Sequence, residues 1–73
     1  MIKIYSKANC SFCEQAKSLL KSKDIDYEEI RIDQDPIAKA FIIAAGHRSV
    51  PQIFDNENLI GGFTELKQFL QKE

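Results

Sequence analysis

The chain has 73 residues, about half the length of an ordinary domain, so it can form one small core. Its 44% hydrophobic and 29% charged residues are typical of a globular chain and not of a disordered one. Ten Lys and Arg against eleven Asp and Glu leave a net charge of −1, which does not support a general attraction to nucleic acid. The longest apolar stretch, Ala40 to Ala45, is much shorter than the roughly 20 residues of a membrane span, and the N-terminus lacks a signal-peptide pattern. We therefore expect neither a nucleic-acid nor a membrane partner.

The first half of the chain predicts a strand, a helix and a second strand. Met1 to Tyr5 is a short β-branched strand, followed by a loop over Lys7 to Asn9. A helix is predicted from about Ser11 to Lys23, because apolar residues recur there at helical spacing. These residues are Phe12, Ala16, Leu19 and Leu20. Tyr27 to Ile32 then alternates, with Ile30 and Ile32 on one face and Glu29 and Arg31 on the other.

The second half predicts a helix, a hairpin and a last helix. Asp35-Pro36 combines an N-cap acid with Pro at the first helical position, and Gly46 is a C-terminal stop. The predicted buried stripe of this helix is Ile37, Ala40, Phe41, Ala44 and Ala45. Strands are predicted at Pro51 to Phe54 and Asn58 to Ile60, joined by a hairpin connection. The last helix runs from about Phe63 to Gln71 and buries Phe63, Leu66 and Leu70.

The predicted order is β-α-β-α-β-β-α in a single domain over residues 1–73, since no linker or repeat interrupts the chain. The first two strands should be parallel with a right-handed crossover, and the hairpin adds an antiparallel pair. We therefore expect an α/β fold of three layers, α/β/α, with a four-stranded mixed sheet and helices on both faces.

Cys10 and Cys13 are the only cysteines. A disulfide between them closes a very small loop and would stabilise the fold little. A closed zinc site needs four ligands, and His47 is the only histidine available beside the two thiols. This leaves a thiol pair kept for its reactivity, and we expect a reducing, cytoplasmic setting.

The start of the first helix favours ionisation of Cys10, because unpaired N–H groups and the helix dipole stabilise an anion there. We expect its thiolate to accept hydrogen bonds from the N–H groups of Phe12 and Cys13, with Lys7 adding positive charge. Cys13, one turn further in, should be more buried. Cys10 is thus the predicted nucleophile and Cys13 the resolving thiol.

A different helix start is also compatible with the sequence. Ser11 and Glu14 fit a capping box, which would begin the helix one residue later and place Cys10 less well. We favour Cys10 as the N-cap residue.

Three segments in this order and spacing resemble the glutaredoxin family: Cys10-Ser11-Phe12-Cys13, Ser49-Val50-Pro51-Gln52-Ile53-Phe54 and Gly61-Gly62-Phe63-Thr64-Glu65-Leu66. The resemblance covers nearly the whole chain. It implies a thioredoxin-like fold and a cis peptide bond before Pro51. A cis bond there would turn the backbone of Val50 toward the thiols, where it can pair with an extended peptide such as glutathione.

The resemblance also implies a set of glutathione-binding residues: Lys7, Phe12, Arg48, Val50, Pro51, Gly62, Phe63, Thr64 and Glu65. Lys7 would meet the glycyl carboxylate, and Val50 would bond the cysteinyl backbone. Backbone N–H groups and the Thr64 hydroxyl at the last helix start would hold the γ-glutamyl carboxylate, and Glu65 would attract the α-amino group.

One segment departs from the family. Ile42 and Ile43 stand where many glutaredoxins carry a Gln that helps to bind the glycyl carboxylate, so Arg48 would supply that charge or Lys7 would act alone. These isoleucines either form an exposed docking surface or are covered by the fold. His47 is interpreted as a loop histidine and not as a catalytic base.

The resemblance implies a monomeric, glutathione-dependent thiol–disulfide oxidoreductase that reduces protein disulfides and glutathione mixed disulfides, with ribonucleotide reductase among the candidate acceptors. No tightly bound cofactor is expected. Two alternatives remain open. One is a [2Fe–2S] carrier in which Cys10 of each of two protomers and two glutathiones hold the cluster, a use that Ser11 permits. The other is a redoxin recycled by thioredoxin reductase.

Overall fold

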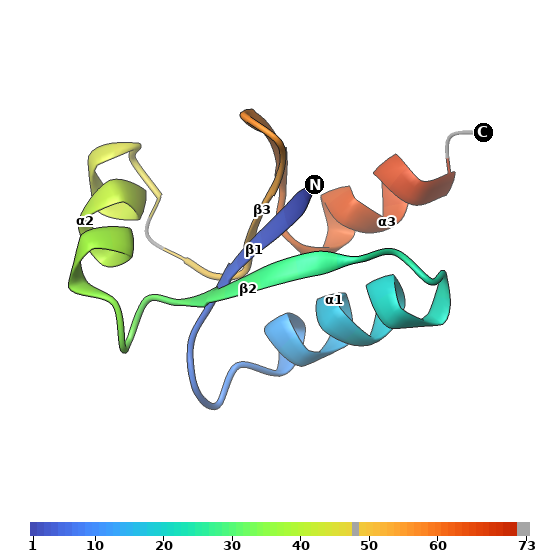
Figure 1. Cartoon of the computed structure of the whole chain (residues 1–73), viewed down its shortest axis with the longest axis horizontal. Coiled ribbons are helices and arrows are strands. Elements are labelled where there is room, and N and C mark those ends of the chain that lie inside the picture. The colour runs from blue at the N-terminus through green and yellow to red at the C-terminus, as the bar shows by residue number, and fades with distance from the viewer. Residues whose placement is uncertain (48, 72–73) are drawn as a thin grey trace.

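The computed structural model describes residues 1–47 and 49–71, which form the predicted succession of strands and helices (Figure 1). The elements are β1 (Ile2–Ser6), α1 (Ser11–Ser22), β2 (Tyr27–Arg31), α2 (Pro36–Ala44), β3 (Gln52–Asp55), β4 (Asn58–Gly61) and α3 (Phe63–Gln71). The predicted element ends differ from these by one residue at most. No helix within the described ranges is long and apolar enough to cross a membrane.

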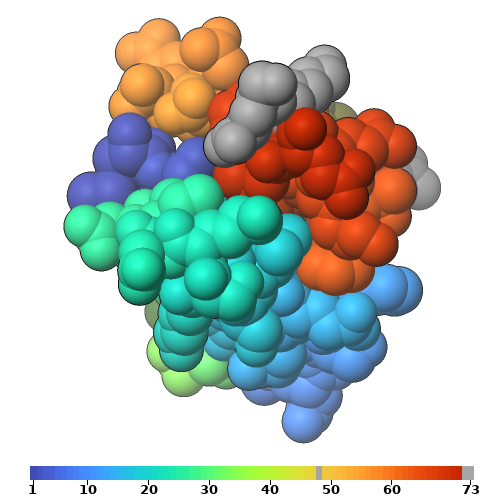
Figure 2. Space-filling model, turned by 90° about the vertical axis from the view of Figure 1, so that its right-hand side faces the viewer, coloured from blue at the N-terminus to red at the C-terminus, as the bar shows by residue number. Residues whose placement is uncertain are grey.

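The four strands form one mixed sheet in the order β2-β1-β3-β4. β1 pairs in parallel with β2 and antiparallel with β3, and β4 pairs antiparallel with β3. α1 and α3 lie together on one side of this sheet and α2 lies on the other (Figure 1). The space-filling view shows the atoms of α1 and α3 packed against each other (Figure 2). The prediction of an α/β fold with helices on both faces is confirmed.

The core lies between the sheet and the helix pair α1 and α3. Its fully or almost fully buried members are Ile2, Ile4, Ala16, Leu20, Ile53 and Leu66. Phe63 and Leu70 are partly buried and pack against this cluster, which agrees with the predicted inner face of α3. Phe12 is 57% exposed, so it does not belong to the core despite its helical spacing.

Both ends of α2 follow the predicted capping rules. Asp35 Oδ1 accepts hydrogen bonds from the N–H groups of Ile37 and Ala38, each at 3.1 Å. At the C-terminal end Gly46 has φ +89°, and its N–H and that of His47 donate back to the carbonyls of Ile43 and Ile42. This pattern is a Schellman motif, which favours Gly at the left-handed position.

The predicted buried face of α2 is wrong. The residues that α2 buries are Ala38 and Ile42. The expected stripe members Ile37 and Phe41 are 83% and 48% exposed, although Phe41 still contacts the rings of Tyr5 and Phe54. Because nearly every residue of α2 is apolar, its sequence defines no single face, and packing against the sheet selects the one that is buried.

Candidate functional site

The two cysteines lie at the start of α1, in the arrangement expected for an N-cap thiol. Cys10 is the N-cap residue, with extended φ −115° and ψ 103°, and α1 begins at Ser11. The N–H of Cys13 donates to Sγ of Cys10, with 3.2 Å between N and Sγ. Among the hydrogen bonds of residues 1–47 and 49–71, none joins the N–H of Phe12 to this sulfur, so only one of the two predicted donors is found. The prediction that Cys10, and not Ser11, caps the helix is confirmed.

Cys10 and Cys13 are joined by a disulfide, so the structure shows the oxidised form of the pair. Cys13 is fully buried, whereas Cys10 is partly exposed. An incoming sulfur can therefore reach Cys10 from solvent but not Cys13. The difference in burial supports the predicted roles of nucleophile and resolving thiol.

The loop that leads into Cys10 is held by Asp33, which follows β2. Asp33 Oδ2 accepts a hydrogen bond from the N–H of Ala8 at 3.2 Å, and the guanidinium of Arg31 donates to both carboxylate oxygens at 2.9 and 2.7 Å. The Arg31 guanidinium is the main reason why the pKa of Asp33 is lowered to about 2, and the bond from Ala8 adds to it. Asn9 completes the loop in the left-handed region, with φ 57°.

A network of hydrogen bonds ties the second turn of α1 to β2. Lys17 Nζ lies 2.9 Å from Glu29 Oε2 and 2.7 Å from Glu14 Oε2, and the buried Ser6 hydroxyl donates to Glu29 at 2.7 Å. The bonds to Glu14 and then to Glu29 raise the pKa of Lys17, and Lys17 followed by Ser6 lowers the pKa of Glu29. Sequence reasoning missed this network. The available signal was Glu29 itself, a charged residue on the strand face opposite Ile30.

The second predicted motif segment, Ser49 to Phe54, lies next to the disulfide. The peptide bond between Val50 and Pro51 is cis, as the resemblance implied. The carbonyl oxygen of Val50 lies 3.8 Å from Sγ of Cys10. Gln52, which is 8% exposed, donates from Nε2 to the carbonyl of Ser49 at 2.9 Å and so holds the loop from inside. The backbone of Val50 thus lies next to the reactive sulfur.

A groove of about 450 Å³ runs from Val50 toward the start of α3. It is lined by Phe12, Ser49, Val50, Pro51, Gln52, Gly61, Gly62, Phe63, Thr64 and Glu65. The rings of Phe12 and Phe63 have centroids 6.2 Å apart and form an aromatic wall, and Lys67 Nζ lies 5.5 Å from the centre of the Phe63 ring. The structure therefore gathers most of the predicted glutathione-binding residues around one groove.

The start of α3 lines this groove. Glu65 Oε1 accepts a hydrogen bond from the N–H of Gly62 at 2.8 Å, so Glu65 caps the helix from its third position. Gly61 has φ +127°, and a Cβ there would lie only 2.7 Å from Glu65 Cγ. The N–H groups of Phe63 and Thr64 belong to the first turn of α3, where the helix itself offers no acceptor. The capping role of Glu65 was not predicted.

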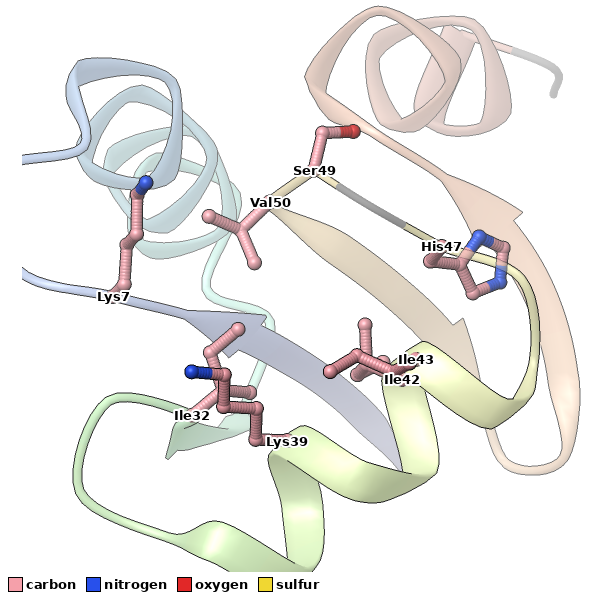
Figure 3. Close-up of a pocket in the computed structure, with 8 residues that line it drawn as sticks. All are labelled: Lys7, Ile32, Lys39, Ile42, Ile43, His47, Ser49 and Val50. Atoms are coloured by element: carbon pink, nitrogen blue, oxygen red, sulfur yellow. The ribbon is translucent and has the colours of Figure 1, made fainter.

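A second, smaller pocket of about 170 Å³ lies on the other side of Val50, toward α2 (Figure 3). It is lined by Lys7, Ile32, Lys39, Ile42, Ile43, His47, Ser49 and Val50. Ile42 is 2% exposed and Ile43 60%, so the fold covers one and leaves the other at the surface. Arg48, the other predicted cation, lies outside the described residues.

The described part of the chain contains no group of three or more His, Cys, Asp and Glu side chains that could hold a metal ion. The two sulfurs of the site are those of Cys10 and Cys13. Both lie at a helix start, and the partly exposed Cys10 is next to Val50, which lines the groove.

Comparison with known proteins decides the family. The family model for glutaredoxin matches residues 2–60. The chain belongs to the glutaredoxin family. It is 40% identical over 73 residues to the glutaredoxin of Neisseria meningitidis serogroup A, a match that covers 97% of this chain and 86% of that protein. As a glutaredoxin with an adjacent cysteine pair, it is a thiol–disulfide oxidoreductase.

Solved structures confirm the thioredoxin-like fold of this glutaredoxin. The NrdH-redoxin of Escherichia coli, described as a glutaredoxin-like protein with a thioredoxin-like activity profile, superimposes with a TM-score of 0.82 at 26% identity and covers 92% of this chain and 91% of its own. A glutaredoxin–glutathione complex from buckwheat gives a TM-score of 0.80 at 28% identity over 96% of this chain and 67% of its own.

Proposed function

We propose that this glutaredoxin is a glutathione-dependent reductase of glutathione mixed disulfides and of protein disulfides. The observation that carries the proposal is the position of the partly exposed Cys10. Its sulfur lies 3.8 Å from the carbonyl oxygen of Val50, a residue that lines two pockets of different charge. The complex of the buckwheat relative with glutathione supports the choice of this thiol.

The charges around Cys10 favour one direction of a bound glutathione. The γ-glutamyl end carries both an ammonium and a carboxylate, and it suits the start of α3, which offers the acid Glu65 beside the N–H groups of Phe63 and Thr64. The glycyl end carries a carboxylate alone, and it suits the pocket that Lys7 lines. The cysteinyl residue between them then lies at Val50, next to the Cys10 sulfur.

The reaction follows the chemistry of thiol–disulfide exchange. The Cys10 thiolate attacks the glutathione sulfur of a mixed disulfide, a new sulfur–sulfur bond forms, and the protein thiolate leaves. A second glutathione thiolate then attacks the same sulfur of bound glutathione and releases oxidised glutathione and the Cys10 thiolate. For a protein disulfide, the Cys13 thiolate displaces the substrate sulfur instead and leaves the Cys10–Cys13 disulfide, which two glutathiones reduce.

The proposal is tested by a glutathione mixed-disulfide assay on the wild type, Cys10→Ser and Cys13→Ser. We expect Cys10→Ser to abolish turnover, because it removes the thiol of the more exposed of the two cysteines. Cys13→Ser should retain reduction of the glutathione mixed disulfide and lose reduction of protein disulfides. Turnover by Cys10→Ser at the wild-type rate would overturn the proposal.

The source of electrons requires a separate assay, because the E. coli NrdH-redoxin has a thioredoxin-like activity profile on the same fold. The oxidised protein is offered either glutathione with glutathione reductase or thioredoxin reductase, and NADPH consumption is followed in each. We expect the glutathione couple to be at least tenfold faster. Faster recycling by thioredoxin reductase would contradict glutathione dependence and favour the redoxin alternative.

A further inference from the structure

The pocket beside α2 contains more apolar space than glutathione can use. Ile32, Ile42, Ile43 and Val50 line it, and Figure 3 shows Val50 on one side of the pocket and the three isoleucines on the other. Its volume of about 170 Å³ is similar to the roughly 150 Å³ cavity that holds benzene in an engineered protein core. The glycine of glutathione has no side chain to place there, so a larger residue would fill the pocket better.

The charges at this pocket are all of one sign. Lys7 and Lys39 line it, and no Asp or Glu does so among the residues that the structure describes. A lone carboxylate is therefore the chemical group that the rim favours. An apolar interior with a basic rim fits an apolar residue whose own or following carboxylate remains near solvent.

The pocket is continuous with the reactive site through Val50, which lines both the pocket and the groove toward α3. An extended peptide advances about 3.3 Å per residue, so the residue after a cysteine bound at Val50 is the first to reach the pocket. We propose that this pocket binds the side chain that follows the reacting cysteine of the substrate, and that it selects peptide and protein disulfides with an apolar residue there and a carboxylate beside it. The inference rests on the proposed function, since it assumes a substrate cysteine at Val50.

The inference is tested with two tripeptides that differ only at this position, γ-Glu-Cys-Gly and γ-Glu-Cys-Leu, each linked by a disulfide to thionitrobenzoate. The Cys10 thiolate of the reduced protein bonds to the peptide sulfur and expels the coloured thionitrobenzoate thiolate, and Cys13 then releases the peptide thiol. We expect the second-order rate constant to be about tenfold higher for the leucine peptide, as for a side chain entering a hydrophobic pocket. The same two disulfides are also reacted with a small dithiol in place of the protein. Dividing by these rates corrects for any difference in the intrinsic reactivity of the two peptide disulfides.

The rim is tested with the C-terminal amide of γ-Glu-Cys-Leu, which keeps the side chain and removes the carboxylate. We expect about a threefold slower reaction for the amide at low salt, and a smaller difference at high salt, because these charges are exposed and screened.

Two variants of α2 locate the effect. Ile43→Gln puts a polar group into the pocket lining and should reduce the leucine preference from about tenfold to about threefold. Ile37→Gln is the matched control, because Ile37 is 83% exposed on the same helix and does not line the pocket. It should keep the full preference.

The outcomes separate the inference from the proposed function. The protein could react equally fast with the two peptide disulfides, and much faster than with the thionitrobenzoate disulfide of a small thiol. That result would overturn the inference and leave glutathione dependence intact. If neither peptide disulfide reacts faster than the small-thiol disulfide, both the inference and the proposed function would be overturned. A leucine preference that Ile37→Gln removes and Ile43→Gln retains would place the side chain elsewhere and also overturn the inference.

Discussion

The two pockets that meet at Val50 differ in how they are built. The pocket beside α3 offers backbone N–H groups of a helix start and the acid Glu65, and its geometry depends on Gly61. The pocket beside α2 offers isoleucine side chains and the long basic side chains of Lys7 and Lys39. The first is therefore fixed by the backbone, and the second by the choice of side chains.

This difference indicates that the two pockets suit different parts of a substrate. A backbone-built pocket changes little when its surface residues change, so it suits the constant part of the proposed substrate, the γ-glutamyl end of glutathione. A pocket built from side chains is free to vary with the substrate. The predictions below test this division.

The largest effect is expected at the backbone-built pocket. Gly61→Ala places a Cβ 2.7 Å from Glu65 Cγ at φ +127°, and it should reduce the free energy of unfolding by about 3 kcal/mol. Gly46→Ala, in the turn after α2, has φ +89° but no atom within 4 Å, so about 1 kcal/mol is expected. Urea unfolding of both variants with the disulfide intact measures the two losses. Equal losses would show that the close approach at Glu65 has no cost.

The second prediction concerns charge at the same pocket. Glu65→Gln keeps an oxygen that can accept the bond from Gly62 and removes the negative charge, so stability should change little. KM for the glutathione mixed disulfide should rise about five- to tenfold, because the proposed ion pair with the substrate ammonium would be lost, while kcat is retained. Steady-state kinetics measure KM and kcat separately. Glu57→Gln, on the β3–β4 connection, is the control and should leave KM unchanged.

The third prediction concerns the side-chain-built pocket. Lys7→Ala should raise KM for the glutathione mixed disulfide about threefold at low salt, since Lys7 is exposed and its proposed attraction to the glycyl carboxylate is weakened by solvent and salt. The effect should disappear in high salt. Lys21→Ala, an exposed lysine in the last turn of α1, is the matched control. A salt-independent increase in KM would argue that Lys7 shapes the loop and does not attract charge.

The smallest effect is expected at the loop that carries Lys7. The folded-state pKa of Asp33 is about 2, below its ordinary 3.8, so between these pH values the unfolded chain binds more protons and stability falls as the pH falls. Asp33→Asn should make the free energy of unfolding depend less on pH in this range, and it should reduce stability slightly near pH 7. Unfolding free energies measured from pH 5 to pH 2 test this. An unchanged slope would mean that other carboxylates, such as Glu29, account for acid sensitivity.

The features that sequence predicted well are those set by local rules. Cys10 at an N-cap and Gly46 at a helix end each need only a few neighbouring residues to be recognised. The groove at Phe63 and Thr64 was predicted through a motif, because the family resemblance assigns three segments that are distant in the chain to one site.

The features that sequence did not predict depend on packing between distant segments. The buried face of α2 was wrong because the helix is apolar on all sides, and only the fold determines that Ile42 points inward and Ile43 stays at the surface. The bond between Lys17 and Glu29 joins two elements whose register no local pattern reveals. The pocket beside α2 depends on both the helix orientation and the Val50 loop, so no local pattern in the sequence predicts it.

The two residues between the cysteines lie on the outer side of α1. Ser11 and Phe12 are exposed, whereas Cys13 and Ala16 on the same helix are fully buried. For protein engineering this is a useful separation, because the reactivity of Cys10 can be retuned by replacing two side chains that carry almost none of the core. A library restricted to these two positions would therefore explore redox behaviour while nearly every member still folds.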